Sequence, residues 1–275
     1  MNIYEKSHKL SDSEFKRLIG VQRDTFEEML QILRKAYAYI HQSRGRKSKL
    51  LIEEMLFVTL KYLRQYPTMK ELAFEYNVGE STIHRTITWV EDTLIRSRKF
   101  TLPSRKALVQ SNSSIDYVLV DVTESPIERP KKKQKDYYSG KKKYHTIKTQ
   151  ILLNQKTKEI LGITQGKGHI HDFRLFKESM GHAIHRKITL LADSGYQGIQ
   201  KIHAKSRIPK KSSKKHPLTR VEKRQNRELS IERILIENIN AKIKVFKIFS
   251  QKYRNRRKRH QLRMSLVCGI YNFEL

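Results

Sequence analysis

The spacing of apolar residues changes near residue 100, and this change constrains the fold more than any other feature of the chain. Before it, apolar residues recur at intervals of three and four, which predicts amphipathic helices. After it, short apolar runs such as "YVLV" and "ITLL" alternate with helical stretches, a pattern typical of α/β domains. The polar segment between them, residues 100–114, indicates a boundary. We therefore expect an all-α domain over residues 1–105 and an α/β domain with a mixed β-sheet over residues 106–275.

The first hundred residues carry clear helix boundaries. Ser11 with Glu14 three residues later is the signature of a capping box at a helix start. A second amphipathic helix is predicted within residues 50–66, where Pro67 stops it. The basic segment at residues 43–49 indicates a linker before that helix.

A helix-turn-helix is predicted over about residues 68–95. The pattern gives a short helix from about Met69 to Tyr76, a turn at residues 77–79 and a second helix from about Ser81. Asn77 suits a turn position with positive φ, and Ile83 would enter the core. An ordinary helical hairpin is the alternative, but the charge of the chain favours DNA binding. The side chains expected to meet base edges are Ser81, Thr82, His84 and Arg85.

The charge of the chain is strongly positive and unevenly distributed. The formal net charge is +31, from 58 Lys+Arg against 27 Asp+Glu. Residues 1–100 contribute +5 and residues 101–275 contribute +26. An excess of this size predicts a polyanionic partner, in most cases nucleic acid, and we expect double-stranded DNA. The first domain would then recognise its target by contacts more specific than charge.

Cysteine content and hydropathy indicate the cellular compartment of the protein. The single cysteine, Cys268, excludes an intrachain disulfide and a thiolate zinc site. The N-terminal sequence "MNIYEKSHKL" lacks the apolar core of a signal peptide, and the chain has no run of 18 apolar residues. We expect a soluble protein of the bacterial cytoplasm, associated with the nucleoid, without a membrane partner.

Three carboxylates stand out in the basic second half. Asp121 and Asp193 each end an apolar run, and acids at strand ends lie where the sites of α/β domains form. For either residue alone, an ordinary turn role after a strand is the simpler reading. Glu237 lies in a helical stretch predicted over residues 219–247, on one face with Arg233 and Lys244. Three acids can converge on a pair of divalent cations, and Mg²⁺ prefers such oxygen ligands.

The order of several sequence blocks resembles that of DDE-type transposases. The blocks are "VLVDVTESPIERPK", "YSGKKKYHTIKTQ", "HIHDFRLF", "LLADSGYQG" and "NRELSIERILIENINAKIKVFKIF". They are most similar to bacterial insertion-sequence family five, which is related to the eukaryotic PIF/Harbinger elements. The resemblance covers nearly the whole chain, including the helix-turn-helix and the ending "VCGIYNFEL".

The resemblance implies an RNase H-like catalytic domain that binds Mg²⁺, with Mn²⁺ as a substitute and two ions in the site. It implies that Asp121, Asp193 and Glu237 are the catalytic residues and metal ligands. Arg233 and Lys244 complete the R-(3)-E-(6)-K spacing and would hold DNA phosphates. Related families place Tyr three residues before the Arg, where this chain has Ser230.

The implied activity is that of an insertion-sequence transposase. It would bind terminal inverted repeats and target DNA, cut at the element ends and join the 3′-OH to the target, as a homodimer or higher oligomer. The resemblance also places His171 and Asp172 near the site in a supporting role. The alternative is a DNA-binding protein without catalysis, such as a repressor or a decayed element.

Two further basic segments and one histidine pair need interpretation. A loop over residues 129–145 would contact phosphates or remain solvated, and we favour phosphate contact because it follows Asp121 closely. The loop cations with this expected role are Arg129, Lys131, Lys132, Lys133, Lys141 and Lys142. His169 and His171 lack a third soft ligand, which argues against zinc. Residues 253–263 are either a solvated helix face or a clamp on the DNA backbone.

Overall fold

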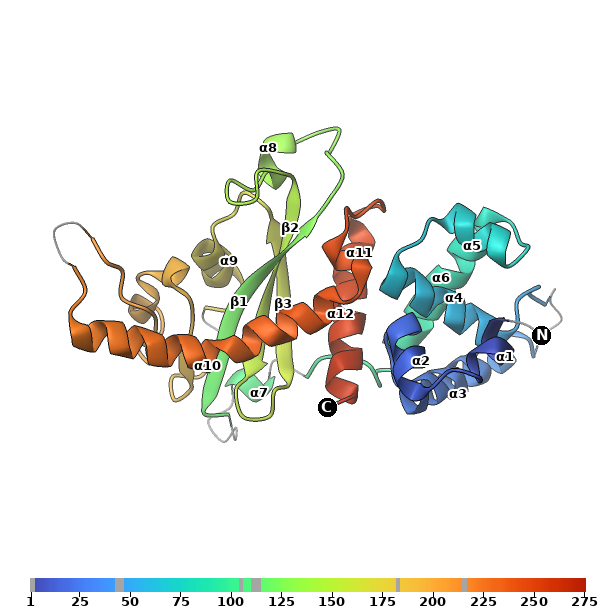
Figure 1. The fold of residues 1–275 in the computed structure, drawn as a ribbon, viewed down its shortest axis with the longest axis horizontal. Helices are drawn as coiled ribbons and strands as arrows, with labels where there is room; N and C mark the ends of the chain where they lie inside the picture. Colours follow the sequence, from blue (N-terminus) through green and yellow to red (C-terminus); the bar gives the residue numbers. More distant parts are fainter. Residues whose placement is uncertain (1–2, 43–46, 104–105, 110–114, 182–183, 214–216) are drawn as a thin grey trace. The chain divides into compact units, whose positions relative to one another are not determined.

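The computed structural model describes residues 3–42, 47–103, 106–109, 115–181, 184–213 and 217–275 (Figure 1). The chain forms two compact units. The first comprises residues 1–101, 243–251 and 255–274, and the second comprises residues 102–242, 252–254 and Leu275. Over the described ranges, no helix is long and apolar enough to cross a membrane.

The first unit is built from helices. Their bounds are α1 (Ile3–Ser7), α2 (Asp12–Ile19), α3 (Arg23–Ile40), α4 (Ile52–Gln65), α5 (Met69–Glu75), α6 (Glu80–Arg96), α11 (Lys247–Ser250) and α12 (Lys258–Phe273). The predicted capping box is present, since the Ser11 side chain accepts the Glu14 backbone N–H and the Glu14 carboxylate accepts the Ser11 N–H. Residues 43–46 of the predicted linker lie outside the described residues.

The predicted helix-turn-helix is formed by α5 and α6. A second capping box, Thr68 with Glu71, starts α5. Asn77 takes the left-handed conformation expected of it, with φ of 49°. Ile83 is fully buried and Ala73 nearly so, where the two helices pack together. The turn chemistry and the apolar spacing therefore predicted this motif correctly.

The C-terminal helix α12 packs with the N-terminal helices. A Cβ at Gly269 would lie 2.2 Å from the Phe100 carbonyl oxygen, so only glycine permits this close approach. Near the chain end, the Glu274 carboxylate accepts the Gln22 backbone N–H at 2.6 Å and the Lys16 Nζ at 2.8 Å. The N-terminal helices and α12 thus belong to one unit.

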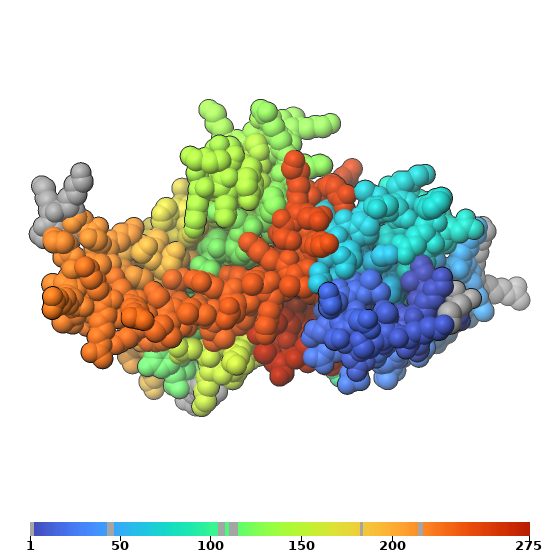
Figure 2. All heavy atoms as spheres, viewed as in Figure 1, coloured from blue at the N-terminus to red at the C-terminus, as the bar shows by residue number. Residues whose placement is uncertain are grey.

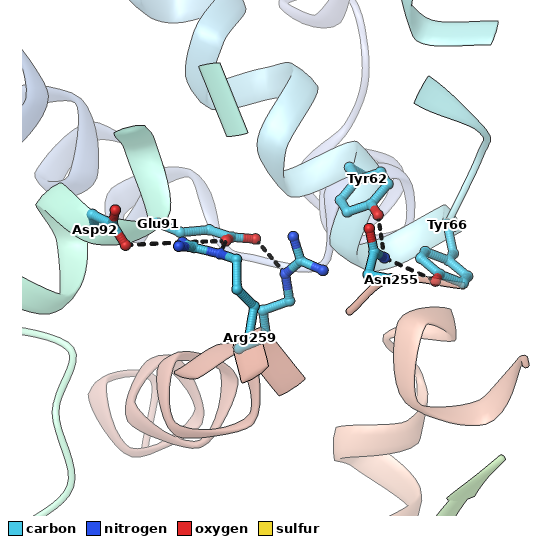
Figure 3. Close-up of polar contacts among 7 residues, drawn as sticks. Tyr62, Tyr66, Glu91, Asp92, Asn255 and Arg259 are labelled. Atoms are coloured by element: carbon cyan, nitrogen blue, oxygen red, sulfur yellow. Dashed lines mark hydrogen bonds and ion pairs between the residues drawn. The ribbon is translucent and has the colours of Figure 1, made fainter. Parts of the chain in front are cut away.

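A buried ion cluster joins α12 to the helix-turn-helix. Glu91 of α6 is fully buried and accepts hydrogen bonds from Arg263 Nε at 2.7 Å and from Arg259 at 2.7 and 2.9 Å. Arg259 also reaches Asp92 at 2.9 Å, as Figure 3 shows. The Arg263 guanidinium lies 5.3 Å from the centre of the Tyr62 ring. A carboxylate withdrawn from water is tolerated here because two guanidiniums surround it.

A second polar contact binds the segment before α12 to α4. The Asn255 amide donates to the Tyr62 hydroxyl at 2.6 Å and to the Tyr66 hydroxyl at 3.1 Å (Figure 3).

Residues 253–263 were interpreted from the sequence as a solvated helix face or a clamp on the DNA backbone. Both interpretations were wrong for Arg259 and Arg263, because these side chains neutralise a buried acid. The predicted second domain also differs from the second unit, since it included residues 243–251 and 255–274.

The second unit contains one five-stranded mixed sheet. Its strands are β1 (Tyr117–Pro126), β2 (Thr146–Asn154), β3 (Ile160–Lys167), β4 (Thr189–Leu191) and β5 (Ser206–Arg207). Its helices are α7 (Lys106–Val109), α8 (Gln134–Tyr137), α9 (Asp172–Ser179), the 3₁₀ turns η1 (Ser194–Tyr196) and η2 (Ile199–Lys201), and α10 (Arg220–Lys244), whose last two residues belong to the first unit. The strand order is β3-β2-β1-β4-β5.

The strand directions agree with the predicted class. β1, β2 and β3 are antiparallel neighbours, whereas β1, β4 and β5 are parallel. This mixed α/β sheet confirms the predicted fold class and is consistent with the RNase H-like fold.

The two faces of the sheet are covered by different helices. Val118 and Val120 point to the face where Phe176 of α9 and Met180, just after α9, lie in the core. Successive residues alternate faces, so Leu119 and Asp121 point to the opposite side. α10 crosses that side of the sheet (Figure 1), with Ile236 and Ile239 buried. The face that carries Asp121 is therefore the one covered by α10.

The Glu91 cluster makes a prediction about stability. We expect Arg263→Ala to lower the free energy of unfolding of the first unit by about 3–5 kcal/mol, because it leaves a buried carboxylate with one partner fewer. Arg34→Ala removes a more exposed pair with Glu53 and should cost about 1 kcal/mol or less. Urea unfolding followed by the fluorescence of Trp89, the only tryptophan, measures both. Equal effects of the two substitutions would contradict the assignment.

Candidate active site

The sequence had suggested that Asp121 ends a strand. In the structure, Asp121 lies in the middle of β1 instead. β1 continues to Pro126 because β2 pairs with it through Pro126↔Thr146. The parallel partner β4, by contrast, pairs only with residues 117–119. Asp121 therefore lies two residues beyond the point where β4 leaves the sheet, and the apolar run marked the end of β4 pairing rather than the end of the strand.

Asp193 lies near enough to Asp121 for its charge to raise the pKa of the Asp121 carboxyl. Leu119 is the last residue of β1 that pairs with β4, through Leu191, and Asp193 follows Leu191 by two residues. β4 itself ends at Leu191, and Asp193 caps η1 by accepting the Gly195 N–H at 2.8 Å. Its second carboxylate oxygen has no hydrogen bond described in this structure.

Of three neighbouring glutamates on α10, only Glu237 lacks an arginine partner among the described ion pairs. Glu232 forms a two-pronged pair with Arg207 at 2.8 and 3.1 Å. Glu228 pairs with Arg224 one turn away at 3.1 Å. Glu237 is exposed, and its charge acts on Asp121 across the α10-covered face. Figure 2 shows α10, in orange, open to solvent along its outer side.

The Asp121 carboxylate is held by two side chains of α10. Arg233 Nη2 lies 3.6 Å from Asp121 Oδ1, and the Asn240 amide donates to Asp121 Oδ2 at 2.8 Å. The pKa of Asp121 is raised to about 6, chiefly because burial penalises its charge. The Arg233 guanidinium lowers this pKa, whereas the carboxylates of Asp193 and Glu237 raise it. Asp193 and Glu237 therefore both lie close enough to Asp121 for their charges to act on it.

The chemistry of this cluster fits a hard divalent cation, although the side chains are not gathered at coordinating distance. Within the described residues, no three His, Cys, Asp or Glu side chains are close enough to hold a metal ion. However, Asp121 and the nearby carboxylates of Asp193 and Glu237 offer the oxygen ligands that Mg²⁺ prefers. The side-chain amide oxygen of Asn240, Oδ1, is also buried without a hydrogen-bond partner. A cation at this point would relieve both the repulsion and the unsatisfied oxygen.

Asn240 is a site residue that sequence reasoning missed. It is 9% exposed and contacts Asp121 directly. Its position three residues after Glu237 places it on the same side of α10, so helical spacing alone contained a signal. That signal was weak, because an asparagine on a polar helix is normally solvated.

The cations predicted near the site differ in their surroundings. Arg233 is mostly buried, with its guanidinium facing Asp121, so its expected phosphate contact stays a prediction. Lys244 ends α10 and belongs to the first unit, and its expected role is likewise untested. Asp172 begins α9 and accepts Lys148 Nζ at 2.7 Å, while His171 is exposed at the helix start. Their supporting role also stays a prediction.

The predicted DNA-contacting side chains are accessible. Arg129, Lys131, Lys132, Lys133, Lys141 and Lys142 are all exposed in and around α8. On α6, Ser81, His84 and Arg85 are exposed and Thr82 is half-buried, all within the first two turns. This is the part of a recognition helix that meets base edges.

Comparisons with known proteins match both units. Residues 120–272 match the family model described as "DDE superfamily endonuclease". Residues 48–100 match the model described as "Helix-turn-helix of DDE superfamily endonuclease". A protein of Microchaete diplosiphon, described as "Probable transposase for insertion sequence element IS702", is 45% identical over 271 residues, which are 98% of each chain. The chain therefore belongs to the transposases of insertion sequences that combine a DDE superfamily endonuclease domain with a helix-turn-helix.

Proposed function

We propose that this transposase uses Asp121, Asp193 and Glu237 to hold two Mg²⁺ ions, with Mn²⁺ as a substitute, and to cut DNA at the ends of its element. The observation that carries the proposal is the position of Asp121 on the α10-covered face of the sheet, where Arg233 and Asn240 hold it and the charges of Asp193 and Glu237 act on it. When bound, the ions would activate the attacking oxygen and stabilise the leaving one in a phosphodiester displacement.

The remaining roles follow from the side chains around this cluster. Asn240 orients Asp121 through the hydrogen bond to Oδ2. Arg233 lies near the charged carboxylate of Asp121. When a metal ion neutralises that carboxylate instead, the Arg233 guanidinium contacts a DNA phosphate. Arg129 and the lysines of the 129–145 loop hold the backbone of the strand being cut.

Recognition of the element ends belongs to α6. Ser81, Thr82, His84 and Arg85 read the terminal inverted repeats, and two copies of the chain bring the two ends together. Cleavage exposes a 3′-OH at each end, which then attacks the target DNA. Family membership supports DNA binding and dependence on a divalent metal, and the choice of Mg²⁺, the number of ions and the assembly are our proposal.

The choice of Glu237 makes a prediction. Glu237→Gln should abolish Mg²⁺-dependent cleavage and strand transfer while leaving specific DNA binding intact, because it removes one ligand from the metal site. Glu232→Gln, the matched control, only breaks a pair with Arg207 and should retain most activity. The assay is cleavage of a duplex carrying the element's own end, with binding checked by gel shift. Loss of cleavage in Glu232→Gln but not in Glu237→Gln would overturn the assignment.

The Asn240 contact makes a second prediction. Asn240→Ala should weaken Mg²⁺ binding by about 10- to 100-fold, the usual effect of removing a group that orients a metal ligand. Isothermal titration calorimetry with MgCl₂ measures this without reference to activity. Asn238→Ala, on the exposed side of the same helix, is the control and should bind Mg²⁺ normally. Equal loss in both variants would show that Asn240 has no special role.

The division between base reading and phosphate binding makes a third prediction. His84→Ala should reduce the preference for inverted-repeat over scrambled duplex by about tenfold, because a base contact carries sequence information. Lys131→Ala should weaken both duplexes equally and lower the salt slope of binding by about 1. Both are measured by fluorescence anisotropy on the full-length chain at several salt concentrations. An unchanged preference in His84→Ala would remove α6 from sequence recognition at that position.

A further inference from the structure

A cavity of about 550 Å³ opens beside the helix-turn-helix of the first unit. It is lined by the end of α3, the residues just before α4, Met55 of α4 and the first three turns of α6. Its most distinctive lining residues are Tyr37, His41, Lys47, Lys49, Arg85 and Trp89. The volume lies within the range of roughly 300–1,000 Å³ found for pockets that bury small ligands. None of the catalytic carboxylates belongs to it.

Three aromatic rings form one part of the lining. The rings of Tyr37 and His41 are stacked, with centroids 4.0 Å apart and planes 24° apart. Trp89 meets Tyr37 edge-on at 6.0 Å. The Tyr37 hydroxyl accepts the Ser48 backbone N–H at 3.1 Å, which fixes the ring against the opposite wall. Rings that are packed and partly exposed offer flat surfaces on which a planar ligand can stack.

Three cations form the rim. Lys47, Lys49 and Arg85 are exposed. Across the described part of the chain, no carboxylate pairs with any of them, although many other cations of this protein have such partners. Arg85 Nε is oriented by the Ser81 carbonyl oxygen at 3.2 Å. The rim therefore favours an anionic group on the ligand.

We propose that this cavity holds one unpaired nucleotide of the bound DNA, with its base against the aromatic rings and its phosphate on Lys47 and Lys49. A phosphate alone would need neither the rings nor this volume, and the bases of an intact duplex are stacked and cannot enter. Arg85 and Thr82 line the cavity and also lie on the part of α6 expected at the major groove. A strand leaving that groove therefore has a short path to the rings.

Stacking on aromatic side chains and contact with cations offset the cost of taking a base out of the helix. That cost is smallest where the base is already unpaired, so the cavity favours a nick, a bulge or a frayed end over continuous duplex. This inference rests on DNA binding by the helix-turn-helix and does not depend on the catalytic carboxylates.

The only tryptophan of the chain lines this cavity, so intrinsic fluorescence reports on it directly. The test titrates the full-length protein, in EDTA, with three probes. They are a blunt 24-base-pair duplex, the same duplex with one unpaired 2-aminopurine nucleotide, and inorganic phosphate. We expect the bulged duplex to quench Trp89, to change the 2-aminopurine emission on binding, and to bind about tenfold tighter than the blunt duplex. Quenching by phosphate to the same extent, or equal binding of the two duplexes without quenching, would overturn the proposal.

Variants separate stacking from general DNA affinity. Tyr37→Leu should remove the preference for the bulged duplex, whereas Tyr39→Leu, an exposed tyrosine two residues away on α3 and outside the cavity, should keep it. Lys49→Gln tests the rim without altering the packed rings and should reduce the same preference. Thermal unfolding verifies that each variant is folded. A preference that survives in both Tyr37→Leu and Lys49→Gln would overturn the assignment. Because EDTA prevents cleavage, a failure here is distinguishable from a failure of the metal site.

Discussion

The pairing of β1 with two different partners sets the geometry of the catalytic unit. β2 pairs with β1 along nine residues, whereas β4 pairs with only the first three. β4 ends at Leu191, opposite Leu119, and Asp193 follows two residues later at the start of η1. Because side chains alternate along a strand, the same register turns Asp121 away from the apolar core formed with α9. The early end of β4 thus leaves Asp193 near Asp121, and the alternation along β1 directs Asp121 toward α10.

Bringing acids together has an energetic cost, and α10 offsets part of it. Burial and the charges of Asp193 and Glu237 disfavour ionised Asp121, while Arg233 and Asn240 favour it. The result is a carboxylate poised between protonation and ionisation near pH 6. A site designed only for stability would replace such groups by apolar residues. Their retention here agrees with a role in chemistry rather than in folding.

In the first unit, by contrast, a buried acid is neutralised by arginine side chains. Glu91 is completely withdrawn from water, yet Arg259 and Arg263 supply enough donors for its two oxygens. This cluster makes α12 part of the helix-turn-helix unit, since α6 cannot bury Glu91 without the arginines of α12. It also leaves the first turns of α6 exposed, and the cavity lined by Tyr37, His41 and Trp89 lies beside them.

The sequence by itself determined the local structure and the chemical class of the site. Capping residues, the Asn77 turn and the change in apolar period predicted the helix-turn-helix and the α/β sheet, because these signals act within a few residues. Apolar runs and helical spacing singled out Asp121, Asp193 and Glu237, and the family resemblance assigned them their expected role. Only the tertiary structure decided that Asp121 lies within a strand, that Asn240 contacts it, and that Arg259 and Arg263 neutralise Glu91. The first feature depends on the pairing of Asp121 with Ile151 of the next strand, and the other two on side chains that meet across more than a hundred residues. Neither helical spacing nor composition specifies which distant partners a charge will find.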